Sequence, residues 1–205
     1  MKKKIIIIDY GLGNIRSAEQ SLKKVVKENN IDADVVITNN AKDIYLASHI
    51  ILPGQGAFET CMKGLKNIEG MIDALSQSVL IKKKPFLGIC VGMQVMTEIG
   101  EEFGRHQGLG WIKGKVVKIK SKILPHIGWN NVVIKKSSKI FTGLSENKDF
   151  YFVNSFHCNL NDKNLVIAET EYEEIFCSAF QKENIIGVQF HPEKSQKTGQ
   201  ILIKN

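Results

Sequence analysis

The sequence predicts an α/β fold with a mostly parallel central sheet that antiparallel strands extend in the C-terminal half. Short, wholly apolar runs rich in β-branched residues in the N-terminal half indicate strands buried on both faces. Segments with helical spacing separate these runs, and such alternation is typical of a parallel sheet. From about residue 115 onward, strand-like segments with two-residue alternation follow one another, which indicates antiparallel pairing.

The N-terminal half begins with the run Lys4–Asp9, and the glycines of segment 10–14 then make a turn. Further strands are predicted at 33–37, 49–52 and 85–89. Helices are predicted at 15–27, after the tight loop 53–56, at 68–81 and at 91–99.

In the C-terminal half the predicted strands are 115–120, 129–135, 150–153, 165–169, 176–181 and 185–190, and a short helix follows near 198–203. No repeat, low-complexity tract or linker divides the chain. Its 205 residues are enough to bury a core. We therefore expect a single domain over residues 1–205.

Composition argues against nucleic acid and membranes as partners. The formal charge is +7, but only Arg16 and Arg105 are arginines, and arginine is the residue that bidentate phosphate and base recognition favours. A basic surface still attracts anionic metabolites or an acidic protein. The apolar run that ends before Asp9 is too short for a signal peptide, and no stretch approaches the ~20 apolar residues of a membrane span.

The four cysteines show no CxxC spacing, so neither a zinc site nor a disulfide framework is expected. Without an export signal, a reducing cytoplasm is the expected location. We interpret Cys61, Cys158 and Cys177 as buried packing residues.

Cys90 is the principal candidate for chemistry. It lies in Gly88-Ile89-Cys90-Val91-Gly92, between a predicted buried strand and a predicted helix. This is the form of a nucleophile elbow, whose sharp turn needs small flanking residues. The N-terminus of the following helix favours a thiolate, and the Val91 N–H is placed to hold an oxyanion.

His191 and Glu193 supply a base and a carboxylate at the end of the strand 185–190. Catalytic groups in open α/β sheets gather at the carboxyl ends of strands. Pro192 biases His191 toward an extended conformation, so Glu193 can accept a hydrogen bond from one imidazole nitrogen. The other nitrogen then remains free to take the proton of Cys90.

The loop Pro53-Gly54-Gln55-Gly56 follows another predicted strand and can lie at the same sheet edge. Its two glycines allow backbone to approach a substrate closely, so the loop can provide a second oxyanion donor.

Together these motifs resemble those of the class I glutamine amidotransferases, and the resemblance covers essentially residues 5–203. Within that family the chain is similar to the glutaminase subunits of imidazole glycerol phosphate synthase. The segments that carry this finer similarity are 8–15, 108–111, 126–130 and 190–196. The resemblance implies a three-layer α/β sandwich.

The resemblance also implies the reaction. Cys90 attacks the side-chain amide carbon of glutamine, His191 moves the proton and Glu193 orients His191. Water then hydrolyses the glutamyl thioester, which gives glutamate and ammonia. The implied site residues are the backbone N–H groups of Gln55 and Val91 as oxyanion donors, and Gly54, Gly56, Gln94, Ser155 and Phe156 as glutamine contacts.

Ammonia would pass to a (β/α)8-barrel cyclase subunit, which makes imidazole glycerol phosphate in histidine biosynthesis. The resemblance places Asn14 and Trp129 near this docking face and suggests no metal or organic cofactor. The chain departs from the family pattern at two positions. Asn154 stands where we expect a histidine, and Phe156 stands where we expect a tyrosine. Neither belongs to the predicted triad, but both affect local hydrogen bonding.

Three alternatives remain open. A paralogous amidotransferase subunit would share the triad and supply ammonia to a different acceptor synthase. An α/β-hydrolase would order its residues nucleophile, acid, histidine, whereas here the histidine precedes the acid. A relative that has lost catalysis would serve as a scaffold, although Cys90, His191 and Glu193 are all present.

Overall fold

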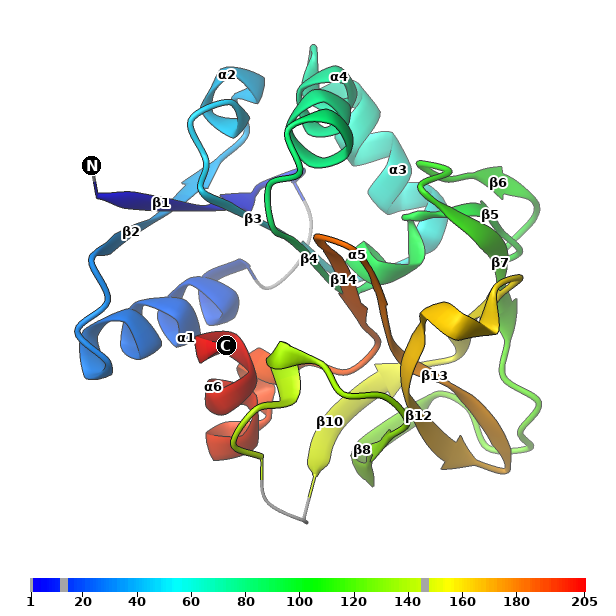
Figure 1. Cartoon of the computed structure of the whole chain (residues 1–205). Helices are drawn as coiled ribbons and strands as arrows, with labels where there is room; N and C mark the ends of the chain where they lie inside the picture. Colours follow the sequence, from blue (N-terminus) through cyan, green and yellow to red (C-terminus); the bar gives the residue numbers. More distant parts are fainter. Residues whose placement is uncertain (1, 12–14, 145–147) are drawn as a thin grey trace.

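The computed structural model describes residues 2–11, 15–144 and 148–205, and these residues form the predicted α/β fold (Figure 1). Within them, one sheet of 12 strands has the order β2-β1-β3-β4-β14-β13-β11-β7-β5-β6, with β12 paired to β13 and β9 paired to β12. Helices α1 and α6 cover one face of its parallel part, and α2, α3 and α4 lie on the other. The three layers that the resemblance implied are confirmed.

The parallel part of the sheet consists of β1 (Lys3–Ile8), β2 (Ala33–Thr38), β3 (His49–Gly54), β4 (Phe86–Cys90) and β14 (Ile185–Val188). Strand β4 pairs in parallel with β3 on one side and with β14 on the other. The carboxyl ends of these three strands therefore meet at one edge, although β14 comes almost a hundred residues after β4.

The helices are α1 (Ile15–Glu28), α2 (Ala41–Ile44), α3 (Phe58–Asn67), α4 (Met71–Leu75), α5 (Val91–Gln94) and α6 (Gln196–Lys204). A π-helix, η1 (Ser76–Ile81), continues α4. Short 3-10 turns are η2 (Lys139–Phe141), η3 (Lys163–Leu165) and η4 (Pro192–Lys194). The predicted helical spacing in α1 is confirmed, because Ile15, Ala18, Leu22 and Val25 are its buried apolar positions.

The C-terminal extension is mostly antiparallel, as predicted. Its strands are β5 (Thr97–Gly100), β6 (His106–Gln107), β7 (Ile112–Lys118), β9 (Val133–Ile134), β11 (Phe156–Leu160), β12 (Val166–Tyr172) and β13 (Glu174–Lys182). Strand β5 is the exception, since it pairs in parallel with β7. A separate two-stranded antiparallel sheet consists of β8 (His126–Asn131) and β10 (Asp149–Asn154).

The predicted helix 91–99 is wrong beyond its first turn. Helix α5 ends at Gln94, whose carbonyl accepts a bond from the Thr97 hydroxyl at 2.9 Å, and strand β5 begins at Thr97. Gly100 is the last residue of that strand. It is a glycine because the Phe58 ring occupies the space where a side chain would lie. Residues 91–97 are all buried, and Glu98 and Ile99 are partly buried, so the periodicity of the segment could not separate strand from helix.

Two further differences lie in the C-terminal half. The predicted strand 129–135 is divided, since β8 pairs with β10 while β9 pairs with β12 in the large sheet. Strand β11 was not predicted, although it occupies a central position between β13 and β7. Its polar residue His157 is buried and interrupts the alternation of apolar and polar positions.

Aromatic packing joins the two-stranded sheet to the large sheet beside the end of β14. Phe190 stacks on Phe150 with 4.0 Å between ring centroids and meets Phe152 edge-on at 5.7 Å. All three rings are fully buried. This contact fixes the chain just before His191.

Among the described residues, no helix has the length and apolar character needed to cross a membrane.

We expect Phe190→Ala to lower the free energy of unfolding by about 3–5 kcal/mol, because it leaves a cavity between the two sheets. The matched control is Phe103→Ala, since Phe103 is 88% exposed and buries almost nothing. Urea denaturation followed by circular dichroism measures both. Equal midpoints for the two variants would contradict the packing role of Phe190.

Candidate active site

Cys90 ends β4 at a sharp and strained bend. Its φ of 54° and ψ of −114° lie in a region that residues with a side chain rarely adopt. Side-chain carbons at Gly92 and Gly54 would overlap neighbouring backbone, at the Leu52 carbonyl oxygen and the Gly92 nitrogen respectively. One at Gly88 would lie 2.5 Å from the Gly92 carbonyl oxygen. The bend therefore forms only where these three positions are glycine.

The helix that follows the bend is shorter than predicted, since α5 has a single turn. Its dipole is correspondingly weaker than that of the predicted helix. Val91 is its first residue, and an N–H at this position has no acceptor within the helix. The Val91 N–H is therefore available to an oxyanion, while a single helical turn adds little dipole field at the sulfur.

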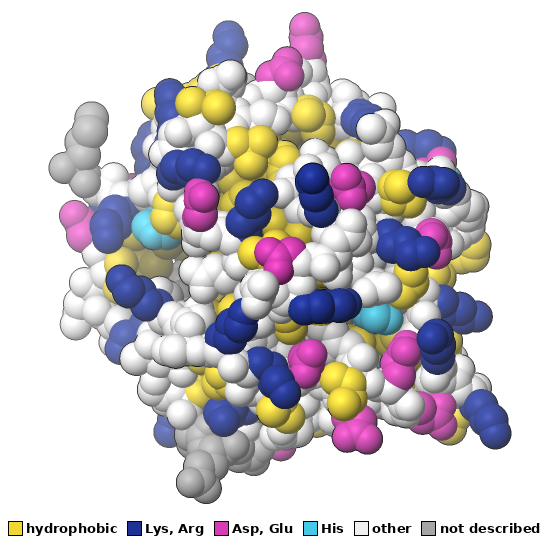
Figure 2. Space-filling view, turned by 45° about the vertical axis from the view of Figure 1, so that its right-hand side comes forward, with side chains coloured by type: hydrophobic (Ala, Val, Ile, Leu, Met, Phe, Trp, Pro, Cys, Tyr) yellow, Lys and Arg dark blue, Asp and Glu magenta, His cyan; other side chains and the backbone are white. Residues whose placement is uncertain are grey.

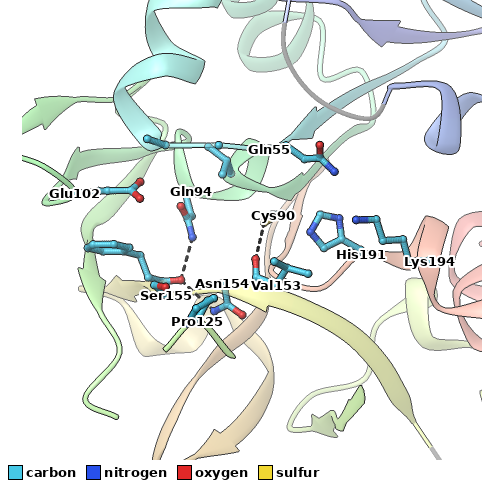
Figure 3. A pocket seen from close by; sticks show the side chains of 14 residues that line it. Gln55, Cys90, Gln94, Glu102, Pro125, Val153, Asn154, Ser155, His191 and Lys194 are labelled. Atoms are coloured by element: carbon cyan, nitrogen blue, oxygen red, sulfur yellow. Dashed lines mark hydrogen bonds between the residues drawn. The ribbon is translucent and has the colours of Figure 1, made fainter. Parts of the chain in front are cut away.

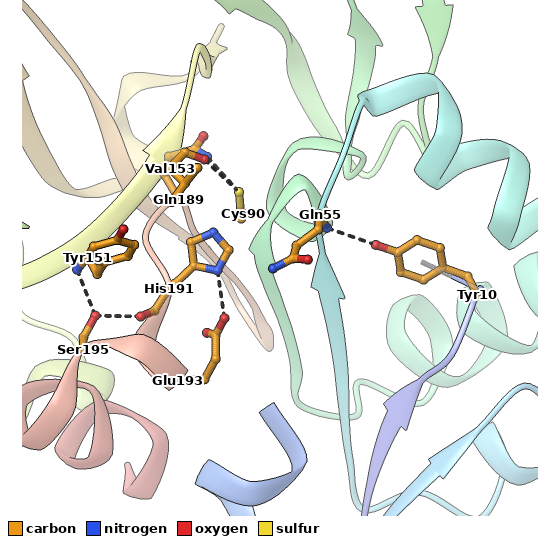
Figure 4. Close-up of polar contacts among 9 residues, drawn as sticks. All are labelled: Tyr10, Gln55, Cys90, Tyr151, Val153, Gln189, His191, Glu193 and Ser195. Atoms are coloured by element: carbon orange, nitrogen blue, oxygen red, sulfur yellow. Dashed lines mark hydrogen bonds and ion pairs between the residues drawn. The ribbon is translucent and has the colours of Figure 1, made fainter. Parts of the chain in front are cut away.

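The His191 ring lies between Cys90 and Glu193 (Figure 4). Its Nδ1 bonds Glu193 Oε1 at 2.8 Å, and both side chains are less than a tenth exposed. This bond places a proton on Nδ1 and leaves the other ring nitrogen for Cys90. Three side chains from two distant parts of the sequence thus meet at one sheet edge.

Charge interactions at His191 outweigh the effect of its burial. Burial alone disfavours the charged imidazolium, but the negative charge of Cys90, a hydrogen bond with Cys90 and the bond to Glu193 raise the pKa of His191 to about 10. The imidazolium form of His191 is thus favoured beside a negatively charged sulfur. Such an ion pair is the reactive form of a cysteine–histidine nucleophile.

The backbone of His191 is held on both sides by the two-stranded sheet and the segment before α6. The His191 N–H donates to the Tyr151 carbonyl at 2.8 Å. The buried Ser195 hydroxyl donates to the His191 carbonyl at 2.6 Å and accepts the Tyr151 N–H at 2.9 Å (Figure 4). Ser195 therefore fixes the backbone from which the imidazole projects.

A cavity of about 500 Å³ opens in front of Cys90 and His191 (Figure 3). The predicted site residues that line it are Gln55, Gly56, Cys90, Val91, Gln94, Ser155, Phe156 and His191. The other lining residues are Ala57, Glu102, Pro125, Val153, Asn154 and Lys194. The fold thus brings the loop after β3, the bend after β4 and the segment after β10 around one space.

Three of the predicted residues that the structure describes do not line this cavity. Glu193 lies behind His191, and Gly54 packs under the bend against the Gly92 nitrogen. Trp129 lies on β8 with 49% of its surface exposed. Asn14 lies outside the described residues.

The predicted oxyanion donor Gln55 is engaged by the protein itself. Its N–H donates to the Tyr10 hydroxyl, with 3.4 Å between nitrogen and oxygen, on the side away from Cys90 (Figure 4). Burial raises the pKa of the Tyr10 hydroxyl, which therefore stays protonated. A bond of this length is weak, but it occupies the N–H that would have to point toward the substrate.

The two departures from the family pattern have clear structural consequences. The Asn154 amide donates to the Phe156 carbonyl at 3.1 Å, so it stabilises the turn after β10. The same carbonyl accepts a second bond, at 3.0 Å, from Gln94. Phe156 itself lines the cavity with its ring in place of a phenol. Hydrogen bonding at this wall therefore depends on backbone and amide groups.

Sequence reasoning missed Glu102, Lys194 and Ser195. Lys194 and Ser195 directly follow the His-Pro-Glu motif, and this adjacency was a usable signal. Glu102 gave no such signal, because it lies in a polar loop after β5. Its Oε2 accepts the Phe58 N–H at the start of α3, at 2.9 Å, and this bond holds the carboxylate at the cavity.

Comparison with known proteins decides the family. A model of the class-I glutamine amidotransferase family (GATase) matches residues 6–205. The chain belongs to the class I glutamine amidotransferases. This membership overturns the α/β-hydrolase alternative.

Curated relatives agree with that assignment, and a solved structure agrees with the fold. Imidazole glycerol phosphate synthase subunit HisH of Rhodospirillum rubrum is 40% identical, over 98% of this chain and 97% of its own length. Subunit HisH 2 of Methanococcus maripaludis is 46% identical with the same coverage. In structure the chain is similar to a glutamine amidotransferase of Thermotoga maritima, with a TM-score of 0.64 at 20% identity, covering 100% of this chain and 82% of that one.

No group of three or more potential ligands among the described His, Cys, Asp and Glu side chains is arranged to hold a metal ion. On the face that Figure 2 shows, lysine and arginine side chains are dispersed among acidic ones. The four cysteines all fall within the described ranges and form no disulfide there.

We expect Glu193→Gln to move the alkaline limb of the pH–activity profile to lower pH. We expect this limb near pH 10 in the wild type, because the surroundings of His191 raise its pKa to about 10. The substitution removes the carboxylate charge that favours the imidazolium, so we expect a downward shift of about 1–2 pH units. The kcat/KM for glutamine between pH 6 and 11 measures it.

Glu101→Gln is the control, because Glu101 pairs with Lys115 in solvent. His191→Ala should be more severe than Glu193→Gln at every pH, since it removes the base itself. An unshifted limb in Glu193→Gln would contradict the orienting role of Glu193.

Proposed function

We propose that this protein is the glutaminase subunit of an imidazole glycerol phosphate synthase. It hydrolyses glutamine to glutamate and ammonia and delivers the ammonia to a cyclase subunit for histidine biosynthesis. The observation that carries the proposal is the strained Cys90 beside the buried His191–Glu193 pair, at a cavity large enough for glutamine. The free cysteines fit the cytoplasmic location that we propose.

Chemistry begins when the Cys90 thiolate attacks the side-chain amide carbon of glutamine. The carbonyl oxygen takes up negative charge, which the Val91 N–H stabilises. His191 donates its proton to the amide nitrogen, the C–N bond breaks and ammonia leaves. A water molecule, deprotonated by His191, then attacks the thioester carbon. The C–S bond breaks, and glutamate and the Cys90 thiolate are released.

A second oxyanion donor requires a change at Gln55. Its N–H must leave the Tyr10 hydroxyl before it can bind the developing charge. In the proposed mechanism, Cys90 and His191 are already in place while the Gln55 N–H is not, so hydrolysis is slow until the loop after β3 adjusts. Losing one oxyanion donor costs about 100–1,000-fold in rate.

Substrate recognition follows from the charges around the cavity. Glutamine carries an α-ammonium group, and Glu102 is the one carboxylate among the described residues that line the cavity. We propose that Glu102 binds this ammonium. Gly56, Gln94 and the Ser155–Phe156 segment then bind the rest of the substrate, while Gly54 acts indirectly by supporting the bend.

The partner surface that we propose is centred on β8. Trp129 and Ile127 are 49% and 59% exposed and, two residues apart on β8, lie on the same face of the strand. Trp129 pairs across the strands with Tyr151 and contacts its ring edge-on at 6.0 Å. The Tyr151 carbonyl accepts the His191 N–H, so only Tyr151 would separate a cyclase bound at Trp129 from the backbone of His191.

We expect Cys90→Ala to reduce glutamate release by at least about 1,000-fold, because it removes the nucleophile. Cys177→Ala is the matched control, since Cys177 is buried on β13 and does not line the cavity. An enzyme-coupled glutamate assay measures both. Near wild-type activity in Cys90→Ala would refute the nucleophile, and an inactive wild type would support the non-catalytic scaffold.

We expect a histidine-pathway cyclase subunit, with its ligand, to stimulate glutamate release, and Trp129→Ala to weaken the complex. Loss of a central tryptophan costs about 2 kcal/mol or more, which corresponds to about a 30-fold rise in Kd. Ile81→Ala is the control, as Ile81 is exposed on η1. If the cyclase neither binds nor stimulates while glutaminase activity persists, the protein is instead the paralogous subunit that supplies ammonia to a different acceptor synthase.

A further inference from the structure

Gln189 is a buried amide in direct contact with the nucleophile. It lies between the end of β14 and His191 and has no exposed surface. Its Nε2 donates to Cys90 Sγ at 3.6 Å (Figure 4). Burying an amide is costly unless it is hydrogen-bonded, so the contacts of this side chain define what it can do.

A backbone carbonyl determines which end of the Gln189 amide faces the sulfur. The Phe156 carbonyl can only accept, so the Gln94 Nε2 must face it, at 3.0 Å. The second N–H of that nitrogen donates to Gln189 Oε1, also at 3.0 Å. With its oxygen thus engaged, Gln189 presents its NH2 group to Cys90. The chain of two amides therefore has one direction and ends on the nucleophile.

A second group at the sulfur favours the opposite protonation state. The Val153 carbonyl oxygen lies 3.8 Å from Cys90 Sγ, where it can accept a bond from a thiol S–H (Figure 3). A carbonyl oxygen next to a thiolate is repulsive, whereas an N–H next to a thiolate is attractive. The Val153 carbonyl thus favours the thiol form of Cys90, whereas Gln189 and His191 favour the thiolate form.

We propose that Gln189 is a catalytic residue that stabilises the Cys90 thiolate through its side-chain N–H, and that Gln94 is the positioning residue that orients it. The inference rests on the proposed glutaminase function and deepens it. The same N–H would stabilise the sulfur when it leaves the thioester carbon as a thiolate in the hydrolysis step. Gln189 therefore acts at both ends of the reaction without giving up a proton.

The test is the pH dependence of Cys90 alkylation by iodoacetamide, which needs no glutamine turnover. Gln189→Met keeps the size of the side chain and removes the donor. Hydrogen bonds to charged groups are worth enough to move the midpoint of the alkylation profile upward by about 1–2 pH units. Alkylation is quantified at Cys90 by peptide mass spectrometry, with Cys90→Ala as the background.

Ser178→Ala is the matched control. Ser178 is equally buried, its carbonyl bonds the Gln189 N–H at 2.9 Å, and its hydroxyl has no partner among the described residues. We expect its profile to match the wild type. Gln94→Met should move the midpoint in the same direction as Gln189→Met but by less, because the Gln189 amide is then free to rotate.

Gln189→Glu provides a second variant if Gln189→Met does not fold. It puts an acceptor against the sulfur, so its midpoint should lie at least as high. An unchanged midpoint in a folded Gln189 variant overturns the proposal. If the midpoint moves as expected but the wild type releases no glutamate, the thiolate contact stands and the glutaminase function fails.

Discussion

The site depends on the close backbone contact between β3 and the bend that follows β4. Gly54 and Gly92 have no side chains at a place where the two backbones approach too closely to admit any. This contact forces Cys90 into a conformation that would otherwise be unfavourable and aims its sulfur out of the sheet. The strain costs on the order of 1–3 kcal/mol, which parallel pairing on both sides of β4 offsets.

Electrostatics at the site follow from the same arrangement. The single turn of α5 contributes only a weak dipole field at the sulfur. The other polar groups around the sulfur come from separate elements. His191 is supplied by the strand next to β4, and its carboxylate partner is only two residues further on. Because these groups are buried, each contact has a larger effect than it would have in water.

The sequence predicted the parts of the fold and site that local chemistry determines. Strands with an apolar run, such as β1 and β4, the bend at Cys90 and the His191–Glu193 pair each depend on neighbouring residues, and all were recognisable. The predicted helix 91–99 was wrong beyond Gln94 because residues 91–97 are all buried, and a wholly buried run has no periodicity that separates a strand from a helix. Glu102 and Gln189 were missed because their roles arise from contacts with residues distant in sequence. The division between β8 and β9 was missed for the same reason, since the two strands pair with different distant strands.

The cavity has walls of different origin. The loop after β3 and the bend after β4 belong to the parallel core, whereas Val153 and Asn154 end strand β10 of the small two-stranded sheet. The seam between them consists of stacked rings and a few backbone bonds, and no strand ladder crosses it at β10. Any displacement of the small sheet would therefore reach the cavity through this seam and through Val153 and Asn154 at the end of β10.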